Sequence, residues 1–186
     1  MRIVGGEFRG RKLASPHTDA IRPTSDRMRE SLFNILSHHP AVRIDGARVL
    51  DLFAGTGALG CEALSRGARF CLFIEEGVEG RGLIRTSVEA FGLQGRTKIY
   101  RRDATKLGDA RPFEPFDLVF ADPPYGRGLG EKALMSAREG GWLKPGALLV
   151  VEEAASSPFE APSGFAISDE RQVGESILRF LTLAPS

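Results

Sequence analysis

Five short, nearly continuous apolar runs recur along the chain, separated by longer stretches with helical periodicity. A short run that is apolar at almost every position is typical of a strand covered on both faces of a sheet, because a half-exposed strand would alternate. The sequence therefore predicts five core strands, at Ala47–Asp51, Phe70–Glu75, Lys98–Arg101, Leu118–Ala121 and Ala147–Glu152.

The stretches between these strands end at glycine, which adopts the left-handed conformation that follows many helices. Two helices are predicted at Ala58–Arg66 and Val78–Phe91, and a third begins near Leu129 and ends at Gly140-Gly141. Alternating strands and helices are typical of βαβ units. We therefore expect an α/β fold with a mostly parallel sheet.

The two ends of the chain depart from this alternation. Phe165–Arg171 and Ser176–Leu183 are strand-like and joined by a short turn, so we expect an antiparallel pair at one edge of the sheet. At the other end, Ile3-Val4 and Lys12-Leu13 flank several glycines and predict a small β-hairpin. A helix is predicted over Asp26–His38 from apolar residues at helical spacing.

The composition is that of an ordinary globular protein, with 186 residues and a net charge of +1. We expect a single domain over residues 1–186. A near-neutral chain must bind an anionic partner through a local patch. The one strong basic cluster is in the N-terminal hairpin, where a single Glu7 stands among Arg2, Arg9, Arg11 and Lys12.

Cysteine usage and hydropathy predict the compartment. Cys61 and Cys71 lie in apolar segments and are expected to be buried free thiols. No apolar run approaches the roughly 20 residues that span a bilayer, and the N-terminus does not resemble a signal peptide. We expect a soluble, cytoplasmic and monomeric protein that contacts no membrane, and we expect no metal site.

A glycine-rich loop, Asp51–Gly60, follows the first predicted strand and opens a helix. Its glycines match the spacing G-x-G-x-x-G, so a dinucleotide site must be considered. Asp51 argues against that reading, because a carboxylate would repel a pyrophosphate at the helix N-terminus but would favour the ammonium group of S-adenosylmethionine. The candidate cofactor-binding residues of the loop are Asp51, Phe53, Ala54, Gly55 and Gly57.

Two acidic positions at the ends of later strands suit the nucleoside part of such a cofactor. Glu75 closes the second strand, where a carboxylate can accept hydrogen bonds from both ribose hydroxyls. Glu76 and Glu79 are close enough to be alternatives. Asp103 and Ala104 follow the third strand and are candidates for the adenine amino group.

The loop Asp122-Pro123-Pro124-Tyr125 follows the strand at Leu118–Ala121 and provides the candidate catalytic residues. Two prolines stiffen the loop and remove backbone donors, so that it presents only acceptors and one aromatic ring. The lone pair of an exocyclic amino nitrogen is delocalised into its base, which makes the nitrogen a poor nucleophile. Asp122 can accept its N–H bonds and stabilise the positive charge that develops, while Tyr125 stacks on the extruded base.

The chain resembles the class I methyltransferases and, more narrowly, the bacterial 16S ribosomal RNA guanine-N2 methyltransferases of the RsmD type. Beside the two loops above, the resemblance is carried by the N-terminal blocks Arg2–Leu13, Arg22–Arg27 and Leu32–Leu36 and by Glu62–Ala68. The sequence departs from the family pattern at two places. Glu76-Gly77 lies where it affects the detail of the ribose site, and Val173-Gly174 lies where it affects the packing of the sheet edge.

The resemblance implies a Rossmann-like sheet, S-adenosylmethionine as cofactor, and methylation of guanine N2 in small-subunit ribosomal RNA on an assembled or assembling 30S particle. It implies that residues 1–25 are an RNA-binding extension, with contacts from Arg9, Arg11, Lys12 and Arg22. It places Thr24 and Arg27 beside the methionine end of the cofactor, although an N-cap of the following helix fits Thr24 and Ser25 nearly as well.

Two other functions stay open on the sequence. A DNA adenine-N6 methyltransferase also uses Asp-Pro-Pro-Tyr, but such enzymes usually need an added recognition region for which this chain has little room. A nucleotide-binding oxidoreductase, or a nucleotide-binding module without catalysis, would rest on Gly55, Gly57 and Gly60 alone.

Overall fold

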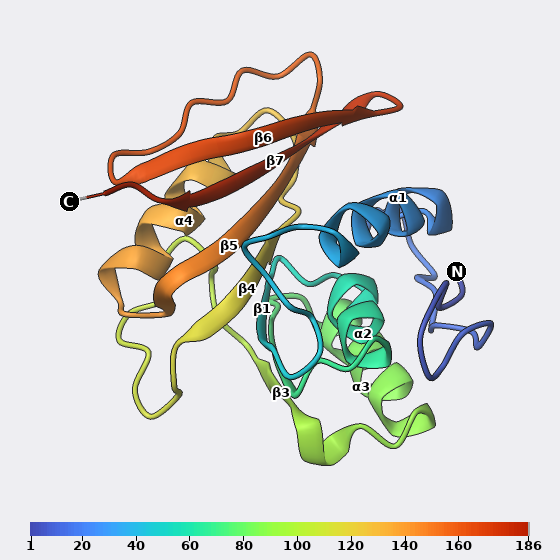
Figure 1. Ribbon diagram of the computed structural model, residues 1–186. Coiled ribbons are helices and arrows are strands. Elements are labelled where there is room, and N and C mark those ends of the chain that lie inside the picture. Colours follow the sequence, from blue (N-terminus) through green and yellow to red (C-terminus); the bar gives the residue numbers. More distant parts are fainter. Residues whose placement is uncertain (186) are drawn as a thin grey trace.

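A computed structural model describes residues 1–185 and contains one seven-stranded sheet in the order β3-β2-β1-β4-β5-β7-β6 (Figure 1). The first five strands run parallel, as the apolar runs predict. They are β1 (Arg48–Leu52), β2 (Phe70–Ile74), β3 (Thr97–Tyr100), β4 (Phe116–Ala121) and β5 (Leu143–Ala154). The fold is therefore the expected α/β, Rossmann-like arrangement.

The last two strands, β6 (Phe165–Val173) and β7 (Ser176–Leu183), form the expected antiparallel pair at one edge. β7 pairs antiparallel with β5, so the C-terminal hairpin extends the parallel sheet instead of lying apart from it. This register brings Ser176 opposite Ala154 and Leu178 opposite Glu152. The beginning of β7 thereby lies at the edge of the sheet at which the parallel strands terminate.

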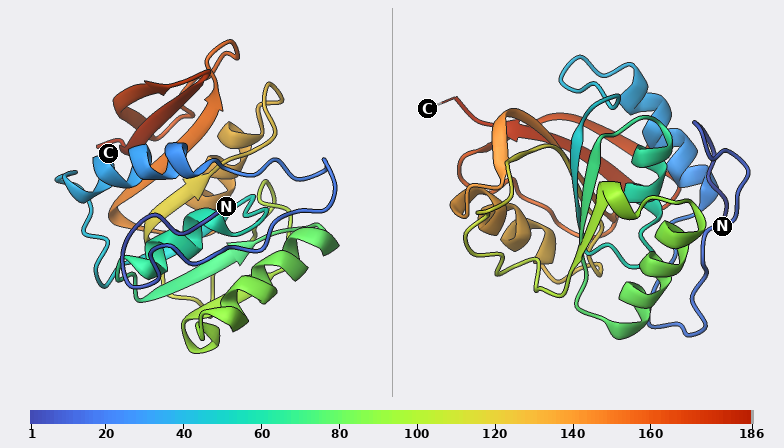
Figure 2. Two further views of the ribbon diagram at one scale, coloured as in Figure 1. Left: turned by 90° about the vertical axis from the view of Figure 1, so that its right-hand side faces the viewer. Right: turned by 90° about the horizontal axis from the view of Figure 1, so that it is seen from below.

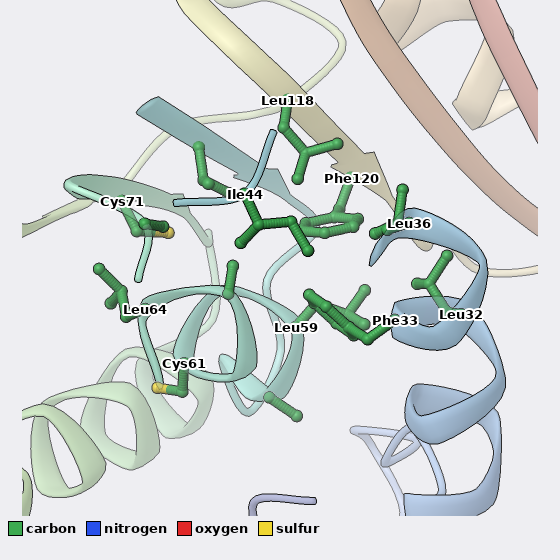
Figure 3. Close-up of a cluster of buried hydrophobic side chains, with 14 of the residues drawn as sticks. Leu32, Phe33, Leu36, Ile44, Leu59, Cys61, Leu64, Cys71, Leu118 and Phe120 are labelled. Atoms are coloured by element: carbon green, nitrogen blue, oxygen red, sulfur yellow. The ribbon is translucent and has the colours of Figure 1, made fainter. Parts of the chain in front are cut away.

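Helices cover both faces of the sheet (Figures 1 and 2). One face carries α1 (Asp26–Ser37), α2 (Ala58–Ser65) and α3 (Val78–Ala90), and the other carries α4 (Leu129–Glu139). Figure 3 shows side chains of α1 and α2, among them Phe33 and Leu59, meeting Phe120 of β4 in one buried cluster. Two apolar layers therefore enclose the parallel strands, which explains their continuous hydrophobicity.

The helices begin and end close to their predicted positions. Gly67 and Gly92 follow α2 and α3 with positive φ angles, as their place in the sequence predicts. Cys61 and Cys71 are buried free thiols, also as expected. Within residues 1–185, no helix has both the length and the apolar character that crossing a membrane requires.

The expected small N-terminal hairpin is present but short: Arg2 and Lys12 form one antiparallel bridge, and backbone hydrogen bonds join Ile3 to Arg11 and Leu13 to Met1. The hairpin is short because several N–H groups of the N-terminal segment bond to α2 instead of to a partner strand. Val4 and Gly5 donate to the Glu62 carboxylate at 3.0 Å each, and Phe8 donates to Ser65 Oγ at 2.9 Å.

The Glu62 carboxylate joins three parts of the fold. Besides the two N-terminal amides, it accepts hydrogen bonds from Arg29 of α1 at 3.2 Å and from Arg66 at 3.1 Å. The side chains of Glu62 and Arg29 are both fully buried. A buried carboxylate is tolerated when cations and N–H groups satisfy it, and here four donors do so.

From this anchor the chain runs along α3 toward the carboxyl ends of the strands. Arg11 donates to the carbonyl of Ala90 at the end of α3, and the amide of Ala14 donates to Ser87 Oγ. His17 and Thr18 then bond to the carboxylate of Glu79, in the first turn of the same helix. Residues 19–24 are thereby delivered to the open edge of the sheet.

We predict that Glu62→Ala lowers the free energy of unfolding by about 3–5 kcal/mol, because it removes the buried carboxylate partner of Arg29 and leaves only the half-exposed Asp26. Urea unfolding followed by circular dichroism measures this change. Glu30→Ala removes an exposed carboxylate from α1 and is the control, with an expected change within about 0.5 kcal/mol. A cost for Glu62→Ala no greater than that of the control would contradict the anchoring role.

Candidate active site at the carboxyl edge of the sheet

A cavity of about 340 Å³ lies where β1, β2 and β4 end, under residues 19–24 of the N-terminal segment. In open parallel sheets ligands bind outside the carboxyl ends of the strands, and this cavity has that position. The cavity collects many of the predicted site residues in one place. Those that line it are Arg22, Thr24, Phe53, Ala54, Gly55, Glu75, Ala104, Asp122, Pro123 and Pro124.

The glycine loop after β1 forms the floor of the cavity. Phe53 and Gly55 have positive φ angles of 53° and 57°, so the chain turns sharply there. Gly57, at φ 78°, lies beneath the lining, and a Cβ at this position would be 2.9 Å from Ile84 of α3. Glycine is therefore needed at Gly57 both for the turn and for the close packing of the loop on the helix.

Asp51 lies behind the loop and is only 1% exposed. Its Oδ2 accepts the amide of Gly60 in α2 at 3.0 Å, and the carboxylate does not line the cavity. Burial raises the pKa of Asp51 well above its ordinary value. Asp51 thus contacts α2 in the structure. Its contact with an ammonium group of the cofactor stays a prediction.

Glu75 is well placed to accept hydrogen bonds from a pair of hydroxyl groups, such as those of a ribose. Its Oε1 accepts the amide of Gly55 at 2.7 Å and its Oε2 accepts the amide of Gly77 at 2.8 Å, which fixes the carboxylate at the cavity wall. Each oxygen retains further acceptor capacity. Of the two alternatives, Glu76 also lines the cavity, whereas Glu79 bonds the N-terminal segment instead.

The segment after β3 contributes Arg102 and Ala104 to the lining. Asp103 lies between them, but its Oδ1 accepts the amide and hydroxyl of Thr105 at 2.8 and 2.7 Å. These bonds lower the pKa of Asp103. The predicted contact of Asp103 with adenine would therefore have to use its other oxygen.

Asp122 stands at the end of β4, held by two residues of the N-terminal segment. Arg22 Nη2 donates to its Oδ1 at 2.9 Å, and the Thr24 hydroxyl donates to its Oδ2 at 3.1 Å. Burial, followed by the nearby carboxylate of Glu152, raises the pKa of Asp122 to about 7, against the opposing effect of Arg22. The negative charge of Asp122 is therefore less favourable than that of an exposed aspartate.

Tyr125 lies on the far side of Asp122, under the Arg22 side chain. The Arg22 guanidinium carbon is 3.8 Å from the centre of the Tyr125 ring, in a cation–π contact. The phenol donates to Glu152 Oε1 of β5 at 2.8 Å and lies 2.8 Å from Ser176 Oγ of β7. Two neighbouring strands, β5 and β7, therefore orient this ring.

A second cavity, of about 250 Å³, adjoins the first and shares Arg22, Thr24 and Asp122 with it. Its other walls include Arg27 and the end of the β6–β7 hairpin, with Glu152 and Ser176 between them. Arg27 thus lines the second cavity and not the first, and Tyr125, whose ring lies under Arg22, lines neither. Asp122 is the carboxylate at which the two cavities meet.

The three hairpin residues predicted to contact RNA lie away from both cavities, near the C-terminal ends of α2 and α3. Arg9 and Lys12 are exposed. Arg11 bonds to Ala90 O at 2.6 Å and lies over the Phe91 ring at 4.8 Å. Arg9, Arg11 and Lys12 are therefore separated from Arg22, the fourth predicted RNA contact, by about the length of α3.

Sequence reasoning missed several residues of the site. Glu152 and Ser176 lie beside Tyr125, Arg102 lines the first cavity, and Asp19 to Ile21 cover it. Glu152 could have been found, because it ends a predicted core strand at the same edge as Asp122. The others depend on the path of irregular segments and on the antiparallel return of β7.

Comparison with known proteins agrees with this geometry. A family model described as "Conserved hypothetical protein 95" matches residues 1–182. The chain is 37% identical over 181 residues to "Ribosomal RNA small subunit methyltransferase D" of Escherichia coli, covering 96% of this chain and 88% of the relative. It is 34% identical over 176 residues to the protein of the same name in Haemophilus influenzae, covering 94% and 89%.

Solved structures agree in fold. The structure of yhhF from Escherichia coli has a TM-score of 0.82 and 32% identity, covering 100% of this chain and 99% of that one. HI0767 from Haemophilus influenzae has a TM-score of 0.78 and 30% identity, covering 99% and 98%. The chain therefore belongs to the family described as conserved hypothetical protein 95, together with the small subunit methyltransferase D proteins.

Proposed function

We propose that this protein transfers a methyl group from S-adenosylmethionine to the exocyclic N2 of a guanine in small-subunit ribosomal RNA. The observation that carries the proposal is the position of Asp122 where two cavities meet. A methyl donor in the first cavity and a base in the second would both lie against this carboxylate. The names of the curated relatives support ribosomal RNA as the substrate.

The first cavity fits S-adenosylmethionine by charge. Four carboxylates line it, from Asp19, Glu75, Glu76 and Asp122, against two guanidinium groups, from Arg22 and Arg102. An acidic cavity disfavours the pyrophosphate of a dinucleotide and favours a ligand with ammonium and sulfonium groups. This balance argues against the oxidoreductase alternative.

Within this cavity, Glu75 would accept the ribose hydroxyls, and the glycine loop would approach the ligand with its backbone. Asp103, Ala104 and Arg102 would border the adenine. Asp51 would act from beneath, by holding the loop against α2. The bound cofactor supplies an electrophilic methyl group on a sulfonium.

Asp122 would prepare the amino nitrogen for attack. Its carboxylate accepts an N–H bond of the amino group, which concentrates the lone pair on nitrogen, and it stabilises the positive charge that forms as the carbon–nitrogen bond is made. The methyl–sulfur bond breaks in the same displacement. The methylated nitrogen then loses a proton, so that one proton is released for each methyl group transferred.

The prolines keep the loop rigid while this happens. Pro123 and Pro124 line the first cavity and offer no N–H group that would compete for the Asp122 carboxylate. Tyr125 supplies the flat face for the base, and its hydroxyl is already engaged by Glu152 and Ser176. The loop would therefore bind the base without rearranging its own backbone.

The substrate would reach the site over α3. Phosphate contacts from Arg9, Arg11 and Lys12 would position the RNA without reading sequence. Since these residues lie near the end of α3 remote from Asp122, an extended RNA surface such as that of a 30S particle suits them better than an isolated nucleotide. We propose a monomer that acts on that particle in the cytoplasm.

The proposal is tested by incubating small-subunit particles with the protein and labelled S-adenosylmethionine, followed by nucleoside analysis of the RNA. We expect N2-methylguanosine at one position. Methylation of adenine in DNA, with none in ribosomal RNA, would favour the adenine-N6 alternative and overturn the proposal.

We predict that Asp122→Asn lowers kcat by about 10²- to 10³-fold, because the amide lacks the charge that stabilises the developing cation. The dissociation constant for S-adenosylhomocysteine, measured by calorimetry, should change little. Asp109→Asn makes the same substitution at an exposed position and should retain full activity. Equal activity of the two variants would contradict the role of Asp122.

We predict that kcat/KM rises with pH through an apparent pKa of about 7, because the pKa of Asp122 is raised to that value. Only the ionised carboxylate can accept the N–H of the amino group and stabilise the developing positive charge. Glu152→Gln removes a neighbouring negative charge that raises this pKa, so the midpoint should move to lower pH. A pH-rate profile from pH 5.5 to 8.5 measures both. A flat profile for the wild type would contradict the assignment.

We predict that replacing Arg9 and Lys12 together by alanine weakens binding to small-subunit particles and lowers the slope of log affinity against log salt by about 1–2. Filter binding at several salt concentrations measures the slope. Arg43→Ala, which removes an exposed arginine elsewhere, is the control. An unchanged slope in the double variant would place the RNA interface on another surface.

A further inference from the structure

We infer that Glu152 selects guanine, by accepting the N1–H of a base that lies on Tyr125 while Asp122 accepts its amino group. The inference rests on the proposed function and deepens it, because the Asp-Pro-Pro-Tyr loop alone does not distinguish one amino base from another. It is carried by the geometry of Arg22, a residue predicted from the sequence only as a contact to RNA.

The Arg22 guanidinium occupies the position that a base on Tyr125 would need. Its central carbon lies 3.8 Å from the centre of the ring. Nη2 donates to Asp122 Oδ1 at 2.9 Å, and Nη1 is 3.8 Å from Glu152 Oε1. One planar group thus turns its two NH₂ groups toward two different carboxylates, and its central carbon lies over an aromatic ring.

Guanine contains the same arrangement of atoms. Its C2 carries the amino nitrogen N2 and the ring nitrogen N1, and both bear hydrogen, as the two nitrogens of Arg22 do. Overlaying C2 on the guanidinium carbon directs N2–H to Asp122 and N1–H to Glu152. The Arg22 side chain is 48% exposed, so it can leave the ring without losing a buried position.

Glu152 is suited to that contact. Its side chain is only 9% exposed, so a hydrogen bond from the base would be made largely out of water. The Tyr125 and Ser176 hydroxyls both bond to Oε1. The same oxygen is the one 3.8 Å from Arg22 Nη1. Among the described residues no side-chain or backbone donor bonds to Oε2, so Oε2 is the oxygen that would accept the N1–H.

The other amino bases lack the matching donor. In adenine and cytosine the ring nitrogen next to the amino group is an acceptor with a lone pair. Placing it against a buried carboxylate would set two acceptors against each other, with no donor between them. A site built to accept a hydrogen bond discriminates strongly against an analogue that cannot donate it.

The test separates the amino group from the N1–H. 2-Aminopurine keeps the 2-amino group but has an acceptor at N1. Small-subunit particles are reconstituted with RNA that carries either guanosine or 2-aminopurine riboside at the mapped methylation site, and kcat/KM is measured for each. We expect the wild type to prefer guanosine by about 100-fold.

Glu152→Gln is the informative variant, because its amide can donate to the acceptor at N1. We expect the preference for guanosine to fall to about 10-fold or less, with a gain in absolute rate on 2-aminopurine. Glu153→Gln, which alters the neighbouring buried carboxylate outside both cavities, should keep the wild-type preference.

A loss of activity on both substrates by the same factor in Glu152→Gln would overturn the inference, since Glu152 would then only orient Tyr125. Failure of the wild type to methylate any guanine of the particle is a different result. It would remove the proposed function itself, and with it the basis of this inference.

Discussion

The path of the N-terminal segment over the sheet depends on the hydrogen bonds that the buried Glu62 carboxylate accepts. The N-terminal segment has only a short hairpin as regular structure, so several of its backbone N–H groups need partners from elsewhere in the fold. Glu62 supplies them from inside the fold, and it also neutralises the buried Arg29. Glu79 and Ser87 continue the attachment along α3. An irregular segment thereby reaches the sheet edge along a defined path.

The site at that edge is organised by charge as much as by shape. Its acidic lining suits a cationic ligand, and Asp122 is placed where a negative charge is costly in the free protein but useful when a positive charge forms next to it. The Arg22 guanidinium meets part of that cost. Binding, selection of the base and stabilisation of the reacting atoms thus draw on the same few carboxylates.

The sheet could be predicted because its strands are buried on both faces, which leaves an apolar signal at nearly every position. The position of Asp122, Glu75 and the glycine loop at the carboxyl edge of the sheet could be predicted because each directly follows or closes a predicted strand. Asp51 could be identified but not placed, since its side-chain direction depends on the packing of α2. Glu152 and Ser176 escaped notice because they join Tyr125 only through the pairing of β5 with β7. The contact of Arg22 with Tyr125, 103 positions further on, has no local signal.

The segment of residues 19–24 borders both cavities, and this has a thermodynamic consequence. If occupancy of the first cavity shifts Arg22 or Thr24, it changes the free energy needed to clear the ring of Tyr125. By linkage, filling the second cavity must then change the affinity of the first by the same factor. Cofactor and RNA would in that case bind with a reciprocal coupling, transmitted by six residues that have no regular secondary structure.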